Sequence, residues 1–194
     1  MSNSGLPKHY TTDIAFTDAV KLIQTQLGSR GSMERLERSD SWPSHLTDDM
    51  KRFITARDSL FLGSASAAGQ PYIQHRGGEP GFVTVRDDRT LIIPDYRGNR
   101  HYISLGNFSE NERSFIFMID YETQTRIKIW GRVSVESLDL ADERKLVFHI
   151  DTWDVNCRQY LPKLWSEKTV QNATRKLVSR IEQLEKEVAE LKRE

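Results

Sequence analysis

The chain has 194 residues, and its 28 Lys and Arg residues balance 28 Asp and Glu residues, so the formal net charge is zero. This balance excludes a uniformly basic nucleic-acid-binding surface, because such binding depends on neutralising phosphates. The one cysteine, Cys157, excludes an intrachain disulfide, and no apolar run approaches the roughly 20 residues that span a bilayer. The N-terminus has no apolar segment typical of a secretory signal, so we expect a cytoplasmic protein with one domain and appendages.

The N-terminal part is predicted to be loose over residues 1–12 and to enter a globular domain over 13–162. Apolar residues at near-helical spacing predict helices at the start of this domain. Gly28 is placed to end the first of them, and Thr47 is placed to cap the last. The helices expected here span 13–27, 33–38 and 46–57.

The middle of the chain changes to short β-type segments separated by polar or glycine-bearing turns. In the last of these segments Ile127 and Ile129 alternate with Lys128 and Trp130, as in a strand with one buried face. The six expected strands span 59–66, 71–75, 82–85, 90–93, 114–120 and 126–137. Their order predicts an α+β fold, an antiparallel six-stranded barrel packed by helices.

The other segments of the domain have weaker patterns. A short helix is expected over 100–105, between the fourth and fifth strands. Residues 141–148 read as helical or mixed, and 149–152 as a further short strand.

Two glycine-bearing turns carry the densest polar groups. Arg76 precedes Gly77 and Gly78 on the first turn, and the second turn follows an apolar strand and precedes a helix start. The second turn carries the polar residues Asp95, Arg97, Asn99 and Arg100 around Gly98. Glycine lets backbone N–H groups approach an anion, a helix start adds unpaired donors, and Arg adds charge in a fork geometry. The two turns therefore predict a site for an anion such as a phosphate.

Residues 166–194 read as one helix with a heptad repeat. Ile181 and Val188 fall at positions a, and leucines fall at positions d, a combination that favours a parallel two-stranded coiled coil. Arg180 would face Glu185 of a second copy, and Glu187 would face Lys192, and both pairs are attractive. The alternative is a lone amphipathic helix that lies on its own barrel.

Several motifs, taken in order over roughly residues 10–162, resemble the pyridoxamine 5′-phosphate oxidase-like family of FMN-binding split barrels, in its predicted flavin-nucleotide-binding branch. The motifs that carry this resemblance are the segments 69–78, 80–82, 88–91, 95–100, 102–107, 127–132 and 153–157. The resemblance implies a split-barrel homodimer with FMN at the subunit interface. It also implies cofactor contacts from Gln74, His75, Arg76, Gly77, Pro94, Asp95, Arg97, Asn99 and Arg100, and contacts to the flavin ring from Arg126, Lys128 and Trp130 of the partner chain.

The chain also departs from the pattern of the true oxidases. Their phosphate-binding strand reads Arg-x-Val-Leu-Leu-Lys, whereas the corresponding strand here reads Gln-His-Arg-Gly-Gly over 74–78. Arg76 and Arg86 are both candidates for the phosphate, and we favour Arg76. The oxidases end in an Arg-containing segment that holds the vitamin, whereas this chain ends in the heptad helix, so we do not expect it to oxidise pyridoxamine phosphate.

Three single residues have two readings each. His75 is a hydrogen-bond donor to the ligand or an outward strand residue, and Trp130 is a core residue or a partner for the flavin ring. Cys157 is a redox-active thiol beside the flavin or a small buried apolar group.

We therefore expect an FMN-dependent oxidoreductase of unknown substrate, with no assigned catalytic residue and no metal site. Its partners would be a second copy and a small-molecule substrate or electron donor, with no nucleic acid and no membrane. The alternative is a non-catalytic flavin-binding or sensing module that acts through its coiled-coil tail.

Overall fold

A computed structural model describes residues 9–39, 42–98, 100–137, 144–156 and 158–192. The chain divides into two compact units. Met1–Ile119 with Arg126–Cys157 form the first, and Asp120–Thr125 with Arg158–Glu194 form the second. Within the described ranges, no helix combines the length and the apolar character that a membrane span needs.

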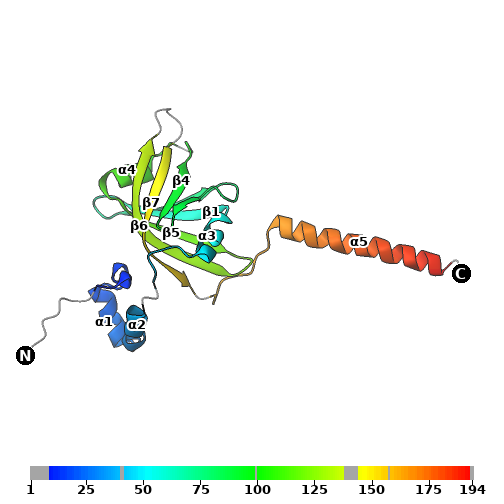
Figure 1. Cartoon of the computed structure of the whole chain (residues 1–194), viewed down its shortest axis with the longest axis horizontal. Coiled ribbons are helices and arrows are strands. Elements are labelled where there is room, and N and C mark those ends of the chain that lie inside the picture. Colours follow the sequence, from blue (N-terminus) through cyan, green and yellow to red (C-terminus); the bar gives the residue numbers. More distant parts are fainter. Residues whose placement is uncertain (1–8, 40–41, 99, 138–143, 157, 193–194) are drawn as a thin grey trace, which may run out of the picture. The chain divides into compact units, whose positions relative to one another are not determined.

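The first unit is built on one antiparallel sheet with the strand order β2-β1-β5-β6-β7-β4-β3. Figure 1 shows its strands. Their bounds are β1 Ser59–Ala65, β2 Pro71–Gly77, β3 Thr84–Asp87, β4 Thr90–Asp95, β5 Arg113–Asp120, β6 Thr125–Ser137 and β7 Arg144–Asn156. The α+β class is confirmed, but the prediction of six strands was wrong. In the described residues the sheet has seven strands and is open, because β2 and β3 end the order.

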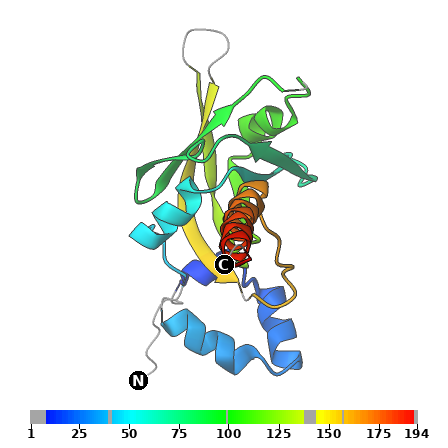
Figure 2. The ribbon, with the colours of Figure 1, turned by 90° about the vertical axis from the view of Figure 1, so that its right-hand side faces the viewer.

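The seventh strand, β7, covers residues 144–148, which were expected to be helical or mixed, and the whole short strand expected over 149–152; residues 141–143 lie outside the described residues. It pairs with β4 and β6 and is the long yellow strand of Figure 2. The consecutive residues Leu146, Val147 and Phe148 are all buried, so both faces of this strand are covered. A strand buried on both faces has no period of two, which removes the pattern that separates it from a buried helix.

The core fills the inner face of the sheet. Alternate residues of the central strands point into it, as the pattern of β6 predicted. Leu60, Leu62, Ile116, Ile127 and Ile129 are all 0% exposed. Two helices close the core, α3 (Asp48–Thr55), which contacts β3, and α4 (Ile103–Glu110), which packs on β1 and β2.

A bulge between β6 and β7 requires Gly131. The pairing shifts between Trp130 and Gly131, so that Asp151 is the extra residue on β7. A Cβ atom at position 131 would collide with the carbonyl oxygen of His149 and with the ring of Phe148. The φ angle of Gly131 is not positive, so its backbone conformation alone does not require glycine. The close approach of β7 is what requires it.

The N-terminal helices have different bounds from those expected. The single helix expected over 13–27 is a 3₁₀ turn, Thr11–Ile14, followed by α1, Asp18–Gln26. The hydroxyl of Thr17 accepts a hydrogen bond from the backbone N–H of Val20 and so caps α1. The next helix, α2, spans Arg30–Arg38 and takes in part of the loop expected after Gly28.

The second unit consists mainly of α5, Glu167–Leu191. The hydroxyl of Ser166 accepts a hydrogen bond from the N–H of Thr169 and caps the helix. Glu122 anchors this start, because its Oε1 accepts hydrogen bonds from the N–H of Ser166 at 2.7 Å and from the hydroxyl of Thr169 at 2.9 Å. The hydrogen bonds from Ser166, above all that from its side chain, lower the pKa of Glu122.

Candidate anion-binding site

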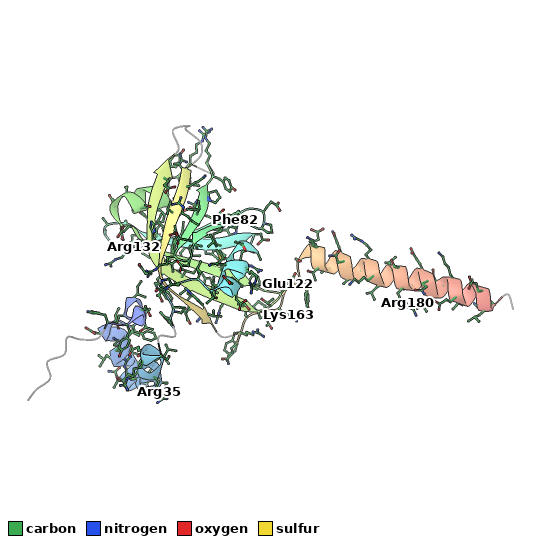
Figure 3. The ribbon with its side chains drawn as sticks, in the orientation of Figure 1. Arg35, Phe82, Glu122, Arg132, Lys163 and Arg180 are labelled. Carbon is green, nitrogen blue, oxygen red and sulfur yellow. The ribbon has the colours of Figure 1, made fainter. Side chains whose placement is uncertain are left out.

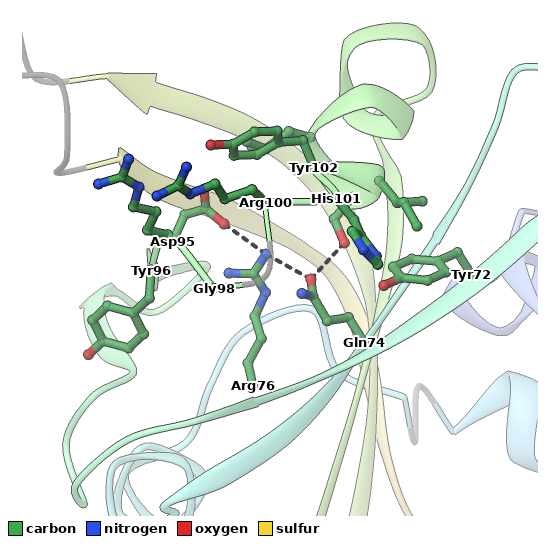
Figure 4. Close-up of a pocket in the computed structure, with 13 residues that line it drawn as sticks. Tyr72, Gln74, Arg76, Asp95, Tyr96, Gly98, Arg100, His101 and Tyr102 are labelled. Atoms are coloured by element: carbon green, nitrogen blue, oxygen red, sulfur yellow. Dashed lines mark hydrogen bonds and ion pairs between the residues drawn. The ribbon is translucent and has the colours of Figure 1, made fainter.

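A polar niche lies where the end of β2 meets the end of β4 (Figure 4). Tyr72, Gln74 and Arg76 contribute to it from β2, because alternate residues of a strand share a face. Gln74 and Arg76 pair with Leu62 and Leu60 of β1, which are buried, so the niche continues the inner face of the sheet.

Arg76 joins β2 to β4. Its Nη2 lies 2.9 Å from Oδ1 of Asp95, and its Nη1 donates to the carbonyl oxygen of Pro94 at 3.2 Å. Oε1 of Gln74 accepts hydrogen bonds from Arg76 at 3.1 Å and from the hydroxyl of Ser104 at 2.9 Å. These contacts, dashed in part in Figure 4, hold the guanidinium group across the gap between two strands that are not neighbours in the sheet.

The carboxylate of Asp95 forms ion pairs with two arginines, Arg76 and Arg144. Its side chain is 7% exposed, and its Oδ2 accepts a hydrogen bond from Nε of Arg144 at 2.9 Å. Arg144 comes from β7 and also lies over the ring of Tyr102 at 5.5 Å. Arg76 and Arg144 thus share one buried counter-ion.

The turn between β4 and α4 is strained. Gly98, Arg100 and Tyr102 have φ values of 47°, 61° and 52°, in the left-handed region. Residues other than glycine rarely adopt this region, so the strain lies at Arg100 and Tyr102. Strain of this kind concentrates at ligand-binding sites. The turn aims the first residues of α4 into the niche, where Ile103, Ser104 and Leu105 are among the lining residues.

The start of α4 has unpaired donors. Within the described residues no side chain caps this helix at Tyr102. The N–H groups of a first helical turn have no partner inside the helix, and they carry the positive end of the helix dipole. They lie beside Arg97 and Arg100, which are exposed and form no ion pair within the described part of the chain. The niche therefore has an excess of positive charge, with four guanidinium groups around the carboxylate of Asp95.

The size of the niche limits what it can hold. Its volume is about 30 Å³, far below the roughly 300–1,000 Å³ of pockets that bury a whole organic ligand. Within the described residues, Nε of Arg76 is buried and has no hydrogen-bond partner. An unpaired buried donor beside an uncapped helix start fits a small anionic group such as a phosphate. It does not fit a flavin ring.

The structure brings together only part of the predicted site. Gln74, Arg76, Asp95, Arg97 and Arg100 line the niche, and Pro94 contributes its carbonyl oxygen. Asn99 lies outside the described residues, as does Cys157.

Two predicted residues of β2 lie away from the niche. His75 points to the other face of β2, where its ring meets Phe61 edge-on at 5.6 Å between centroids. Gly77 pairs with Ser59, and a Cβ atom on Gly77 would lie 3.2 Å from the carbonyl oxygen of Asp58. The side chain of His75 is exposed on that face.

The predicted ring-binding residues lie on β6 and do not line the niche. Trp130 stacks on Trp42 with centroids 4.8 Å apart and meets Phe115 edge-on at 5.2 Å, so it packs against aromatic rings of its own chain. Arg126 and Lys128 pair across the ladder with Asn156 and Asp154 of β7.

These β6 and β7 residues form a second polar cluster. Nε of Arg126 and Oδ1 of Asn156 are buried without a hydrogen-bond partner in the described residues. Burial raises the pKa of Asp154, and the positive charge of Lys128 opposes this effect only in part.

Arg86, the alternative phosphate ligand, lies outside the niche. Its guanidinium donates to both carboxylate oxygens of Glu136, at 3.1 and 2.9 Å. The pKa of Glu136 is lowered by this hydrogen bond with Arg86. Both side chains are nearly half exposed, so the pair is a surface ion pair.

Four residues of the niche and its surroundings were not predicted from the sequence. Tyr72 could have been found, because it lies on the same strand face as Gln74 and Arg76. Ser104 and Tyr102 lie at a helix start that was expected three residues earlier. Arg144 carries no local signal, since its partner Asp95 is 49 positions away.

A family model described as pyridoxamine 5′-phosphate oxidase matches residues 46–154, which is more than half of the chain. No curated protein sequence matches the chain.

Solved structures with a similar fold include three from bacteria. A putative pyridoxamine 5′-phosphate oxidase from Lactobacillus delbrueckii is 14% identical, with a TM-score of 0.45, over 58% of this chain and 95% of that chain. An FMN-binding protein from Syntrophomonas wolfei is 11% identical, with a TM-score of 0.44, over 69% and 97%. The heme storage protein HutZ from Vibrio cholerae is 17% identical, with a TM-score of 0.40, over 57% and 94%. Similarities at this level assign no cofactor to the chain.

Proposed function

The chain belongs to the pyridoxamine 5′-phosphate oxidase family, and on this basis we propose that it is an FMN-binding oxidoreductase that works as a homodimer. The phosphate of FMN binds in the niche between β2, β4 and the start of α4.

The observation that carries this proposal is the uncapped start of α4 beside Arg97 and Arg100, which form no ion pair with another described residue. Arg97 and Arg100 supply charge from the turn, and Arg76 supplies the donor Nε, which has no partner among the described residues. A phosphate takes several such donors at once, because each of its oxygens accepts hydrogen bonds and arginine can bind two of them. Asp95 holds Arg76 in place through a short ion pair and so orients it before the ligand arrives.

The flavin ring has to lie outside the niche, whose volume of about 30 Å³ accommodates only the phosphate end. We assign the ring contacts to Arg126 and Lys128 of a second copy. Two buried atoms of this cluster, Arg126 Nε and Asn156 Oδ1, lack partners in the described residues, which favours a polar ligand there. Trp130 is left out of the assignment, because Trp42 already stacks on its ring.

FMN would supply hydride or electron transfer, so this chain would need no acid or base of its own for the redox step. The residues named here bind and orient the cofactor. A second candidate is a flavin-binding module without turnover that acts through its tail, and the exposed apolar stripe of α5 favours it. Steady turnover with a reduced nicotinamide donor would separate the two, since a module without turnover would not oxidise the donor continuously.

The test compares FMN with riboflavin, which lacks the phosphate. We expect the purified protein to bind FMN, seen by flavin absorbance bands and by mass spectrometry of the released ligand. Riboflavin should bind much more weakly. Charge-assisted hydrogen bonds contribute about 1.5–3 kcal/mol each, so Arg100→Ala should weaken FMN binding by roughly 10- to 100-fold.

The same substitution should leave riboflavin binding unchanged, because Arg100 would contact only the phosphate. The matched control is Arg86→Ala, which removes an arginine that is bound to Glu136 outside the niche and should bind FMN like the wild type. Protein that takes up no flavin, or that carries a heme Soret band instead, would refute the proposal. Equal affinity for FMN and riboflavin would refute the phosphate assignment alone.

A further inference from the structure

Helix α5 presents an apolar stripe of exposed side chains. None of its 25 residues is buried, and Arg180 projects from it in Figure 3. The residues of the stripe follow the spacing of three and four that marks a heptad repeat. They are Val170 at 51% exposure, Leu177 at 65%, Ile181 at 54%, Leu184 at 42%, Val188 at 48% and Leu191 at 70%.

The stripe is too regular and too long for scattered surface residues. Single exposed apolar side chains are ordinary, whereas a contiguous apolar surface marks an interaction site. The first turn of α5 is held by its own unit, through the contacts of Glu122 with Ser166 and Thr169. The stripe begins just beyond that anchored turn and continues to Leu191.

We propose that this stripe pairs with the same stripe of a second copy, in a parallel and in-register two-stranded coiled coil. β-Branched Ile181 and Val188 occupy positions a, and leucines occupy positions d, the arrangement that selects two parallel strands. Val178 lies at position e with 47% exposure, and it would meet Ala173 at position g of the other copy. That contact extends the apolar seam toward the start of the helix.

Charge selects the parallel direction. Parallel pairing places position g of one helix against position e of the other, five residues further along. Arg180 then faces Glu185, and Glu187 faces Lys192, and symmetry repeats each attractive pair. An antiparallel pair brings g against g and e against e, so it forms neither of these contacts.

The side chains at these positions are available for such pairing. Within one helix Arg180 lies 3.9 Å from Glu187, but their side chains are 57% and 50% exposed. Solvent screens an exposed pair of this kind, so it holds the two side chains only weakly. Both can therefore turn toward a second helix.

The seam is short, and Thr174 is a polar residue at its first a position. About three heptads give a weak coil by themselves, since isolated short helices are marginal in water. Any other contact between the two copies would strengthen it by raising the effective concentration of one tail near the other. The pairing itself does not depend on flavin binding.

The experiment uses the full chain with Cys157→Ser, so that an introduced cysteine is the only thiol. Leu177→Cys places the thiol at position d, away from the middle of the stripe, and Ser179→Cys places it at the outward position f as the matched control. In a parallel, in-register coil the two Leu177→Cys thiols face each other, and mild oxidation should give a covalent dimer. The Ser179→Cys variant should remain mostly uncrosslinked under the same conditions.

Crosslinking no greater for Leu177→Cys than for Ser179→Cys would overturn the proposal. The proposal would also be overturned if crosslinking occurred only when Leu177→Cys chains were mixed with Val188→Cys chains, because these two positions meet only in an antiparallel pair. A second measurement tests the charge argument without relying on apolar packing. Arg180→Glu should reduce crosslinking through Leu177→Cys several-fold, and adding Glu185→Arg should restore it. Failure of that rescue would refute the register.

Discussion

Asp95→Asn should destabilise the protein strongly, because it removes a buried counter-ion that two arginines share. In the wild type the carboxylate oxygens of Asp95 lie 2.9 Å from Arg76 and 2.9 Å from Arg144. A guanidinium group stays protonated in proteins, so both cations keep their charge when the carboxylate is lost. They would then lie near each other in the sheet with no opposing charge between them.

The magnitude follows from the burial of the three side chains. Removing one partner of a buried ion pair costs about 3–5 kcal/mol. Asp95 is 7% exposed and Arg76 is 10% exposed, but Arg144 is 24% exposed and keeps part of its hydration. We therefore expect a loss near the lower end, about 3 kcal/mol of the free energy of unfolding.

The matched control is Glu136→Gln. It breaks the ion pair with Arg86, whose side chains are 45% and 49% exposed, and it should cost less than about 1 kcal/mol. Urea unfolding at neutral pH, followed by tryptophan fluorescence, measures both losses.

Inorganic phosphate supplies a second arm of the experiment. An anion that binds only the folded state stabilises it in proportion to the logarithm of its concentration over its dissociation constant. Phosphate should therefore stabilise Asp95→Asn more than the wild type, since it replaces the missing negative charge. Equal losses for Asp95→Asn and Glu136→Gln would refute the argument that Asp95 is a buried, shared counter-ion.

Two further predictions concern stability. Gly131→Ala should cost at least about 1–3 kcal/mol of the free energy of unfolding, because its Cβ would collide with His149 and Phe148 of β7. Gly31→Ala is the control, since a Cβ at position 31 meets nothing within 4 Å and should stabilise α2 by up to about 1 kcal/mol. Thermal unfolding that ranks the two variants otherwise would contradict this prediction. Asp154→Asn should stabilise the protein at neutral pH, because burial raises the pKa of Asp154 and disfavours its charged form. Because the folded-state pKa of Asp154 is raised, the wild type loses stability as the pH rises through that pKa and the buried carboxyl group ionises. Below the ordinary value of 3.8 the carboxyl group is protonated in both the folded and the unfolded protein, so the gain in stability from Asp154→Asn in urea melts should vanish there.

The strands with one buried face could be predicted from the sequence, whereas β7 was predicted only in part, as the short strand over 149–152. In β6, Ile127 and Ile129 are buried while Lys128 between them is partly exposed, and alternation of this kind is visible in the sequence. In β7, Leu146 to Phe148 are buried in succession because neighbours cover both faces. The short strand expected over 149–152 was not counted in the barrel, so the expected sheet lacked the link between β6 and β4 and had six strands instead of seven.

The gathering of polar residues at the turn after β4 was predictable because these residues are close in the sequence. Arg97, Gly98 and Arg100 are close in the sequence, and the start of α4 follows directly. The pairing of Arg76 with Asp95, and of Asp95 with Arg144, depends on which strand ends meet in space. No sequence pattern records that meeting, so neither the shared counter-ion nor the small size of the niche could be foreseen.

The open edge of the sheet has a consequence for hydrogen exchange. Backbone ladders hold β1, β5 and β6 between neighbours, but β2 ends the sheet, and Arg76 joins it to β4 through side-chain contacts. Amides of β2 should therefore open by local fluctuations of lower free energy than those of the central strands. An anion that bridged Arg76 and α4 would fasten this edge, and slower amide exchange in β2 would report its arrival even if the rest of the chain showed no change.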